Sequence, residues 1–263
     1  MKKITIIGGG NLGTAIAEGL IESGFIKAKD LTVTRRNVKA LEKLSKKGVI
    51  TTSDNKSAIE TANLIIVSLK PYQVREFLKE HSYVFKNNQV IVSTVTGTWL
   101  KELRDCIGAK GILFRAMPNT AIAIKESMTC IAYEKATDQQ IKFVKDLFEK
   151  LGKVVFIEEK LMDAATVLGA CGTAFAMRYI RANIQGGVEI GFDAATATFI
   201  SAQTIKGAAQ MLLQHKTHPE QEIDKVATPK GCTIAGLNEM EHQGFSSSLI
   251  KGLVASYDKI SEL

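Results

Sequence analysis

The feature that most constrains this chain lies near its start, where an apolar run leads directly into a glycine-rich turn. Ile4–Ile7 has the composition of a β-strand, and Gly8, Gly10 and Gly13 follow it in the spacing GxGxxG. In that spacing Gly8 permits a tight turn, Gly10 lets the backbone approach a pyrophosphate, and Gly13 lets the next helix pack on the strand. The pattern predicts a dinucleotide site, with a glycine-rich turn that holds no ligand as the alternative.

The residues after this turn bear on the choice of cofactor. A helix predicted over Asn11–Glu22 would present the N–H groups of residues such as Asn11 and Leu12, and its positive end, to the phosphates. The next predicted strand ends in Arg35 and Arg36, not in the Asp or Glu that usually accepts hydrogen bonds from the ribose of NAD. Guanidinium groups suit a 2′-phosphate. We therefore expect NADPH, with NADH as the alternative, and we expect at least one arginine merely to face solvent.

Strand and helix patterns alternate through residues 1–157. The run Leu64–Leu69 is apolar apart from Ser68, as is typical of a strand buried on both faces of a parallel sheet. The alternation predicts an α/β Rossmann-type doubly wound parallel sheet in this region. Strands are predicted at Ile4–Ile7, Leu31–Thr34, Val49–Thr51, Leu64–Leu69, Gln89–Thr94, Ile112–Phe114, Cys130–Tyr133 and Val154–Ile157, and helices at Asn11–Glu22, Val38–Lys47, near Leu100 and at Asp138–Leu151.

The character of the chain changes after residue 157. From Leu161 onward the β-branched runs disappear, and small apolar residues recur at helical spacing around most of the helix circumference. Helices without a generous polar face must be buried, which a small domain cannot achieve alone. We predict an all-α dimerisation domain over residues 158–263 that forms a homodimer, with higher homo-oligomers as an extension. The alternative is that these helices simply cover the sheet.

Composition argues against a nucleic-acid-binding protein. The chain of 263 residues carries 34 Lys and Arg against 27 Asp and Glu, a net charge of +7. Its basic residues are dispersed, and the densest cluster, Lys43–Lys47, holds only three lysines. An anionic small ligand explains such a balance equally well, so no nucleic-acid partner is expected.

The spacing of cysteines and histidines argues against a metal site. The four cysteines form no CxxC pair, and the four histidines lack ligand spacing, so we expect neither a metal nor a disulfide framework. No apolar stretch reaches the roughly 18 residues of a membrane span. The first residues are too few for a signal peptide, and a cytoplasmic location is expected.

Several further motifs occur in a fixed order along the chain. They are Val67–Pro71, Arg115–Thr120, Gln203–Met211, His218–Pro219 and Lys230–Leu237. Together with the glycine turn, this set resembles the pyrroline-5-carboxylate reductase family, which performs the last step of proline biosynthesis. The resemblance covers nearly the whole chain. It implies NADPH-dependent reduction of 1-pyrroline-5-carboxylate to L-proline by hydride transfer to the ring C=N, at an active site on the domain and subunit boundary.

The resemblance also implies roles for residues of the second domain. Thr233 would hydrogen-bond the ring nitrogen of the substrate, and the loop before it would receive the carboxylate. Because its hydroxyl stays protonated at neutral pH, Thr233 would orient the substrate, with the proton coming from solvent or from an iminium. A helix cap is the alternative role for Thr233. The substrate-binding residues implied are Asn119, Thr228, Lys230, Gly231, Cys232 and Thr233.

On the cofactor side, the resemblance places Lys70 and Pro71 beside the ribose and nicotinamide, and Asn55 near the adenine ribose. The alternative is that Pro71 stops a strand and starts a helix, and that Ser53–Asn55 forms an ordinary helix-capping turn.

The chain departs from the family pattern at several substrate-side positions. Gly169–Phe175 stands where Ser-Gly-Ser-Gly-Pro-Ala-Tyr is usual, so that Cys171 replaces a serine, and Arg181 replaces a glutamate. Lys230 replaces a glycine; if that position has positive φ, the lysine costs about 1 kcal/mol there, or the loop is reshaped. Lys230 also offers a cation to a carboxylate. Two alternatives therefore stay open: reduction of a related cyclic imine or small carbonyl acid, and a non-catalytic dinucleotide-binding dimer.

Overall fold

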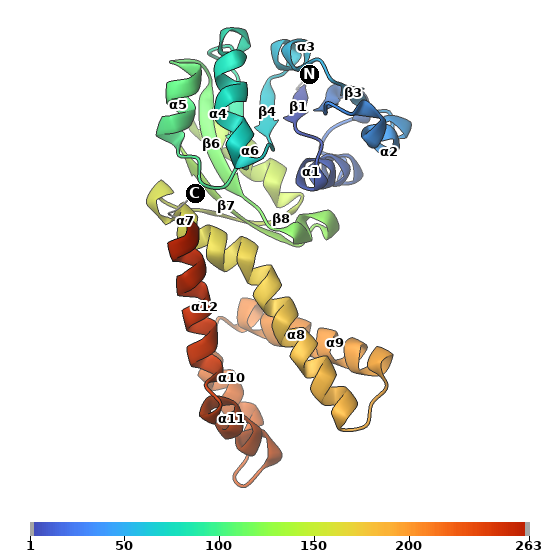
Figure 1. The fold of residues 1–263 in the computed structure, drawn as a ribbon, viewed down its shortest axis with the longest axis vertical. Helices are drawn as coiled ribbons and strands as arrows, with labels where there is room; N and C mark the ends of the chain where they lie inside the picture. Colours follow the sequence, from blue (N-terminus) through green and yellow to red (C-terminus); the bar gives the residue numbers. More distant parts are fainter. Residues whose placement is uncertain (1–2, 261–263) are drawn as a thin grey trace. The chain divides into compact units, whose positions relative to one another are not determined.

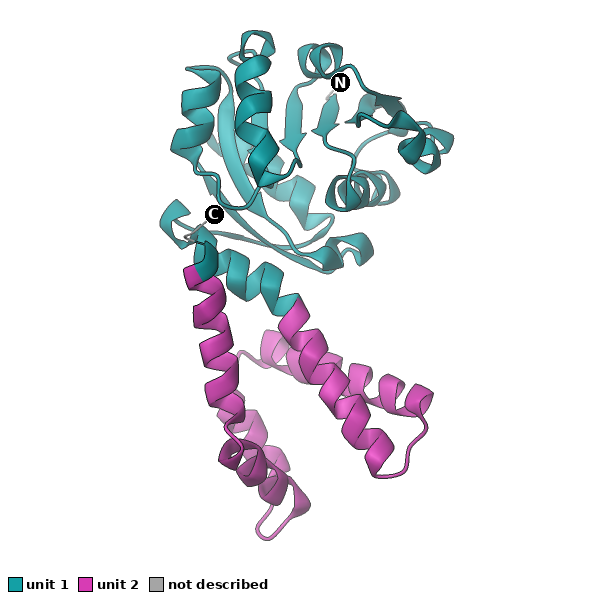
Figure 2. Ribbon diagram, in the orientation of Figure 1, with its two compact units in different colours: residues 1–173, 259–263 teal, residues 174–258 magenta. Residues whose placement is uncertain are grey.

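The computed structural model describes residues 3–260 and divides into two compact units (Figure 2). The first unit comprises residues 1–173 and 259–263, and the second comprises residues 174–258. The sequence prediction placed the domain boundary between residues 157 and 158, directly after the last strand, whereas the compact units divide between residues 173 and 174.

The first unit is built on one eight-stranded sheet with the strand order β3-β2-β1-β4-β5-β6-β7-β8 (Figure 1). The order reverses between β1 and β4, which is the switch point at which doubly wound sheets bind ligands. The predicted strands are all present, with ends that differ by a few residues. The strands are β1 (Ile4–Ile7), β2 (Leu31–Thr34), β3 (Ile50–Thr52), β4 (Leu64–Val67), β5 (Val90–Ser93), β6 (Ile112–Met117), β7 (Ser127–Tyr133) and β8 (Gly152–Phe156).

The predicted doubly wound parallel sheet is confirmed, with one exception that the sequence pattern did not indicate. Strand β7 runs antiparallel to β6, whereas every other neighbouring pair is parallel. The two strands are joined by the short segment Pro118–Glu126, which contains only a 3-10 helix (Thr120–Ile124). A parallel crossover needs a dozen or more residues, so this connection leads to an antiparallel pair.

Helices cover both faces of the sheet and enclose two apolar cores. In β4, Leu64 and Ile66 belong to one core and Ile65 and Val67 to the other, so all four side chains are buried as the continuous apolar run predicted. The helices of this unit are α1 (Asn11–Glu22), α2 (Glu42–Lys46), α3 (Asn55–Thr61), α4 (Pro71–Glu80), α5 (Leu100–Ile107), α6 (Asp138–Glu149) and α7 (Met162–Ala165).

Two local details differ from the predicted helices. The helix expected over Val38–Lys47 is a 3-10 helix over Val38–Leu41 followed by α2. A π-helical segment, Thr166–Cys171, leads from α7 into α8. Such segments are rare and are found frequently at functional sites, and this one overlaps the first part of the stretch Gly169–Phe175, in which the sequence departs from the family pattern.

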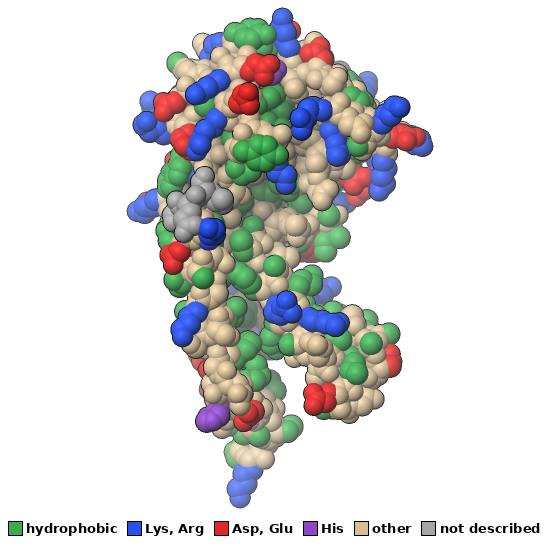
Figure 3. Space-filling model, viewed as in Figure 1, with side chains coloured by type: hydrophobic (Ala, Val, Ile, Leu, Met, Phe, Trp, Pro, Cys, Tyr) green, Lys and Arg blue, Asp and Glu red, His purple; other side chains and the backbone are tan. Residues whose placement is uncertain are grey.

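The second unit is all-helical, as predicted. Gly187 of α8 packs against Ala197 of α9, and the rings of Tyr179 and Phe245 lie 5.9 Å apart. Charged side chains of both signs are interspersed over the first unit in Figure 3, whereas the second shows mostly hydrophobic and uncharged surface. Its helices are α8 (Gly172–Glu189), α9 (Ala194–His215), α10 (Pro219–Val226), α11 (Cys232–His242) and α12 (Phe245–Ile260).

Candidate active site

The glycine turn is shaped by steric contacts that only glycine satisfies. Gly8 has φ +102°, and a Cβ there would lie 2.2 Å from the carbonyl oxygen of Ser68 at the end of β4. A Cβ on Gly13 would lie 2.2 Å from the carbonyl oxygen of Gly8. Gly8 and Gly9 both donate their N–H groups to the carbonyl oxygen of Thr34 at the end of β2. The structural roles predicted for Gly8 and Gly13 are therefore confirmed.

The N-terminus of α1 is open to an anion. Gly10 is the N-cap residue, no side chain among residues 3–260 caps the helix, and its first turn carries no acid. The first N–H groups of an α-helix have no acceptor within the helix, so those of Asn11 and Leu12 are available to a ligand. A Cβ on Gly10 would have no described atom within 4 Å. The space over this helix end fits the pyrophosphate for which the GxGxxG spacing is suited.

A cavity of about 1380 Å³ opens over this helix end, entirely within the first unit. Its volume exceeds that of pockets for drug-sized ligands, as a dinucleotide requires. Of the residues predicted to bind cofactor, Gly13 and Pro71 are not among those that line it. The predicted residues that do line it are Gly8, Gly10, Asn11, Leu12, Arg35, Arg36, Asn55 and Lys70.

The two arginines after β2 both line the cavity, but they are held differently. Arg35 donates from Nη1 to the carbonyl oxygen of Gly9 at 2.8 Å. Arg36 is exposed on the same wall. Arg35 therefore does not merely face solvent, because its bond ties the end of β2 to the glycine turn. Two guanidinium groups on one wall give this end of the cavity a positive charge suited to a phosphate.

An acid at the mouth of the cavity is already satisfied by its own helix. Asp54 is the N-cap of α3, and its Oδ1 and Oδ2 accept hydrogen bonds from the N–H (3.1 Å) and hydroxyl (2.6 Å) of Ser57. These bonds, the one from the hydroxyl first, lower the pKa of Asp54. Asn55, the first residue of α3, lines the cavity. The turn thus caps a helix and also brings Asn55 to the wall of the cavity.

Lys70 and Pro71 form the start of α4. Lys70 is the N-cap residue and lines the cavity, whereas Pro71 occupies the first helical position and does not. A proline at this position has the φ that a helix needs and lacks an N–H that would go unpaired. Pro71 thus starts the helix, as the alternative predicted, whereas the strand β4 already ends at Val67.

Asn119 is a structural clamp in this unit. Its N–H donates to Ser127 Oγ at 3.1 Å, its Oδ1 accepts from the N–H of Ala121 at 3.0 Å, and its Nδ2 donates to the carbonyl oxygen of Gly169 at 3.1 Å. The last bond joins the β6–β7 connection to the π-helical segment. The neighbouring Thr120 lines the cavity, and Asn119 does not.

In the second unit, the predicted substrate loop forms a tight turn before α11. Lys230 has φ +60°, so the replacement of a glycine puts a lysine in the left-handed region. The N–H of Gly231 donates to the carbonyl oxygen of Thr228 at 2.9 Å, and a Cβ on Gly231 would lie 2.4 Å from Thr228 Oγ1. Gly231 is the N-cap of α11. Thr233 is the second residue of the helix, so the alternative that it is the cap is wrong.

Upstream of this loop, a cluster centred on Glu222 fixes the corner between α9 and α10. Its Oε1 accepts hydrogen bonds from Lys225 Nζ at 2.8 Å and from the Thr217 hydroxyl. These bonds, with His215 nearby at 3.6 Å, lower the pKa of Glu222 to about 2. The sequence interpretation did not identify this cluster, although Glu222 and Lys225 lie three residues apart on one helix and that spacing was an available signal.

Comparisons with known proteins bear on both units. The model of the family described as NADP oxidoreductase, coenzyme F420-dependent, matches residues 3–97, and that described as pyrroline-5-carboxylate reductase dimerisation matches residues 159–263. Pyrroline-5-carboxylate reductase 2 of Dictyostelium discoideum is 41% identical over 99% of this chain and 93% of its own length. The chain belongs to the pyrroline-5-carboxylate reductase family. It is thus an NADP-dependent oxidoreductase.

Two more pyrroline-5-carboxylate reductases extend this comparison. Reductase 1 of D. discoideum is 43% identical over 99% of the chain, which spans only 49%, about half, of that relative's length. The solved reductase from Coxiella burnetii is 25% identical, covers 99% of this chain and 98% of its own, and superposes with a TM-score of 0.91. The predicted fold class, a Rossmann-type sheet followed by a helical dimerisation domain, is thereby confirmed.

Family resemblance did not reveal how much of the cavity wall α4 supplies. Residues one turn apart on one side of this helix line the cavity, as do Ser68 and Thr94 at the ends of β4 and β5. The available signal in the sequence was the spacing of these residues by three and four positions, which places their side chains on one side of a helix. The α4 residues are Tyr72, Gln73, Glu76, Phe77 and Glu80, and His81, the C-cap of the helix, lines the cavity as well.

The described residues contain neither a candidate membrane span nor a candidate metal site. Within residues 3–260, no helix is both long and apolar enough to cross a membrane. In the same part of the chain, no three His, Cys, Asp or Glu side chains are grouped as a metal site requires.

Proposed function

We propose that this chain reduces 1-pyrroline-5-carboxylate to L-proline with NADPH. The observation that carries the proposal is the 41% identity to a pyrroline-5-carboxylate reductase over nearly the full length of both proteins. An intact glycine turn and an uncapped, cavity-facing α1 support it. The reaction adds a hydride to the ring carbon of the C=N bond and a proton to the ring nitrogen.

In this proposal the first unit holds the dinucleotide. The N–H groups at the start of α1 bind the pyrophosphate, and Arg35 and Arg36 bind the 2′-phosphate. Lys70 and Asn55, which line the same cavity, contact ribose groups of the dinucleotide. Bound NADPH supplies the hydride.

The second unit holds the substrate. Thr233, half-buried in the first turn of α11, donates a hydrogen bond to the ring nitrogen. The turn Thr228–Cys232 receives the carboxylate, and Lys230 adds a cation beside it. Thr233 has no means of acting as a strong acid, because its hydroxyl stays protonated. The nitrogen is therefore protonated from solvent, or before binding as the iminium, and Thr233 fixes its position.

Asn119 takes part indirectly in this scheme. Its bonds to Ser127, Ala121 and Gly169 hold the β6–β7 connection, and with it Thr120, in place against the cavity. It acts as a positioning residue, and we propose no direct contact between Asn119 and substrate.

We also propose that two copies associate through the helical unit. Among the described residues of α8–α11, Ala197 alone is fully buried, although many apolar side chains are large. Burial of apolar surface contributes about 25 cal/mol per Å², so such helices are stabilised by a partner. Exposed apolar side chains that a second copy would cover include Met177, Ile190, Phe199, Leu213 and Ile250.

Steady-state oxidation of NADPH tests the reaction. We expect turnover with 1-pyrroline-5-carboxylate well above that with other cyclic imines or small carbonyl acids. Turnover only with those other compounds contradicts the substrate assignment. Tight binding of NADPH without turnover on any imine contradicts catalysis and favours a dinucleotide-binding dimer.

Thr233→Val tests the substrate role of the threonine. Loss of one hydrogen bond to the reacting nitrogen should lower kcat/KM by about tenfold or more. Thr233→Ser restores the hydroxyl and should restore most of the rate, while the Kd for NADPH should not change in either variant. Ser248→Ala, which removes an exposed hydroxyl of α12 outside the proposed site, serves as a control and should leave kcat and KM unchanged. Unchanged kcat and KM in Thr233→Val would refute the proposed hydrogen bond from Thr233 to the substrate.

Sedimentation velocity tests the association. We expect a dimer or a larger assembly across micromolar concentrations, and Phe199→Asp should shift it toward monomer. A wild-type monomer at all concentrations contradicts the proposal. The expected cytoplasmic location stays a prediction, which cell fractionation would check.

A further inference from the structure

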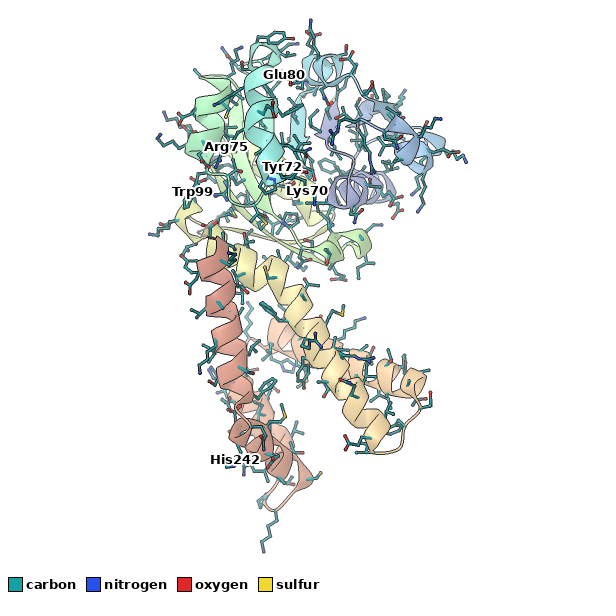
Figure 4. The ribbon with its side chains drawn as sticks, viewed as in Figure 1. Lys70, Tyr72, Arg75, Glu80, Trp99 and His242 are labelled. Atoms are coloured by element: carbon teal, nitrogen blue, oxygen red, sulfur yellow. The ribbon has the colours of Figure 1, made fainter. Side chains whose placement is uncertain are left out.

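An aromatic side chain on the wall of the cavity has no part in the scheme above. Tyr72, the second residue of α4, lines the cavity, and 80% of its surface is exposed. It follows Lys70 and Pro71 directly, and Figure 4 shows Tyr72 and Lys70 at one end of α4 and Glu80 at the other. An exposed tyrosine ring that borders a ligand cavity offers a large flat apolar face at small entropic cost.

The position of Tyr72 on its helix determines which part of the cavity it borders. Tyr72, Glu76 and Glu80 are four residues apart, so they lie on one stripe of α4, and all three line the cavity. Residues 53–56, at the start of α3, line the same cavity. Helices α3 and α4 pack on the same face of the sheet, since Ile59 and Val74 share one core. The stripe and the start of α3 thus form two walls of one region.

This region is the end of the cavity at which an adenosine belongs. The inference rests on the proposed cofactor site, in which the pyrophosphate lies at the start of α1 and the 2′-phosphate at Arg35 and Arg36. That places the adenosine half on the β2 and β3 side of the switch point, beside residues 53–56. The nicotinamide half then extends the other way, toward Thr94 and Thr120.

We propose that the ring of Tyr72 stacks on the adenine of the dinucleotide. Adenine is flat, with apolar faces and polar edges, and stacking of a base on an aromatic side chain contributes enough to change affinity by about tenfold. The contact does not involve the 2′-phosphate. Tyr72 therefore contributes equally to the binding of NADPH and NADH, whereas Arg35 and Arg36 discriminate between them.

Isothermal titration calorimetry of the full chain tests this role. The titrants are NADPH, NADH, adenosine 2′,5′-bisphosphate, which carries the adenine, and nicotinamide mononucleotide, which does not. In Tyr72→Ala the Kd values for both dinucleotides and for the bisphosphate should rise by the same factor of about ten. The Kd for the mononucleotide should not change. Tyr72→Phe keeps the ring and should bind all four as the wild type does.

A matched control is Tyr83→Ala, which removes another exposed tyrosine close to the end of α4. Tyr83 does not line the cavity, and its ring lies 5.8 Å from Lys56 Nζ. This variant should bind all four titrants as the wild type does.

Two results would overturn the role of Tyr72. One is an unchanged Kd for adenosine 2′,5′-bisphosphate in Tyr72→Ala. The other is a larger loss for the mononucleotide than for the bisphosphate, which would place the ring over the nicotinamide. Failure of wild-type chain to bind either dinucleotide would instead refute the proposed cofactor site itself. Because binding is measured without substrate, the result does not depend on which imine is reduced.

Discussion

Two loops in this molecule each precede a helix that has a glycine N-cap and no side-chain cap. They differ in the type of residue that adopts a positive φ. In the first, before α1, Gly8 has φ +102°. In the second, before α11, the residue with positive φ is Lys230, at +60°. Both helix ends offer free N–H groups to an anion, the one to a pyrophosphate and the other, as proposed, to a carboxylate.

The difference between the loops follows from what surrounds the strained residue. A Cβ at Gly8 would collide with the backbone of β4, so no side chain fits there. Lys230 is exposed, and its backbone conformation is one that an L-residue adopts at a cost of about 1 kcal/mol. The first loop is fixed by steric contacts with the sheet, whereas the second leaves space for a charged side chain at the residue with positive φ. The cofactor loop therefore follows its family pattern while the substrate loop departs from it.

The largest effect is expected at the cofactor loop. Gly8→Ala places a Cβ 2.2 Å from the Ser68 carbonyl oxygen at a φ that alanine disfavours, and should lower the free energy of unfolding by about 3 kcal/mol. Gly10→Ala is the control, because no described atom lies near its Cβ. It should unfold as the wild type does yet bind NADPH weakly. Urea denaturation and NADPH titration check both. Equal stability of the two variants would contradict the steric account.

The next effect separates the two arginines that flank the cofactor loop. Replacing both Arg35 and Arg36 with Ala should raise the KM for NADPH by about tenfold or more, and that for NADH far less. Arg36→Ala alone should affect only NADPH. Arg35→Ala should also affect NADH somewhat, because its bond to the Gly9 carbonyl oxygen supports the turn. An equal effect of the double variant on the two cofactors would refute the assignment of the 2′-phosphate site.

A smaller effect is expected at the substrate loop. Lys230→Gly relieves the positive-φ strain and should raise the free energy of unfolding by up to about 1 kcal/mol. It should also raise the KM for 1-pyrroline-5-carboxylate severalfold by removing a cation. Lys230→Met keeps the strain and should change KM alone. Lys216→Gly, at another positive φ (+55°), should change stability alone. If the KM for 1-pyrroline-5-carboxylate in both Lys230 variants equals that of the wild type and of Lys216→Gly, Lys230 does not contact the carboxylate.

The smallest effect concerns the corner before the substrate loop and depends on pH. The folded-state pKa of Glu222 is about 2, below its ordinary value of 4.5, so its contribution to stability is present above pH 4.5 and is lost as pH falls toward 2. Glu222→Gln should therefore be less stable than wild type at pH 7, with a difference that shrinks between pH 4.5 and pH 2. Urea denaturation across this range measures it. Glu220→Gln, an equal charge change on α10, should show no such trend. A difference that is constant with pH would argue against the depressed pKa.

Much of the fold was predictable because its signals are local. The run Leu64–Leu69, apolar apart from Ser68, predicted a strand buried on both faces, and β4 is buried throughout. The direction of β7 was not predictable in this way, because both parallel and antiparallel strands have alternating or apolar runs. It follows from the shortness of the connection Pro118–Glu126, which becomes informative only once β6 and β7 are known to be neighbours.

The residues of the candidate site likewise differ in whether a local signal or a distant contact determines their role. Residues with a steric or charge requirement of their own, such as Gly8 and Arg36, were found from spacing alone. Residues whose role depends on a distant partner were assigned incompletely: Asn119 is a clamp to Gly169, fifty positions away, and Tyr72 lines a wall completed by α3.

The sequence by itself determined the cofactor class of this protein. The spacing of Gly8, Gly10 and Gly13 reflects steric requirements of a dinucleotide-binding turn, and these act within a few residues. The sequence also determined the division into a strand-rich first part and a helical second part, since periodicity is a local property. Only the tertiary structure decided that Arg35 braces the glycine turn and that α4 lines the cavity. These facts depend on contacts between segments far apart in the chain, which packing of the whole sheet creates and no local pattern records.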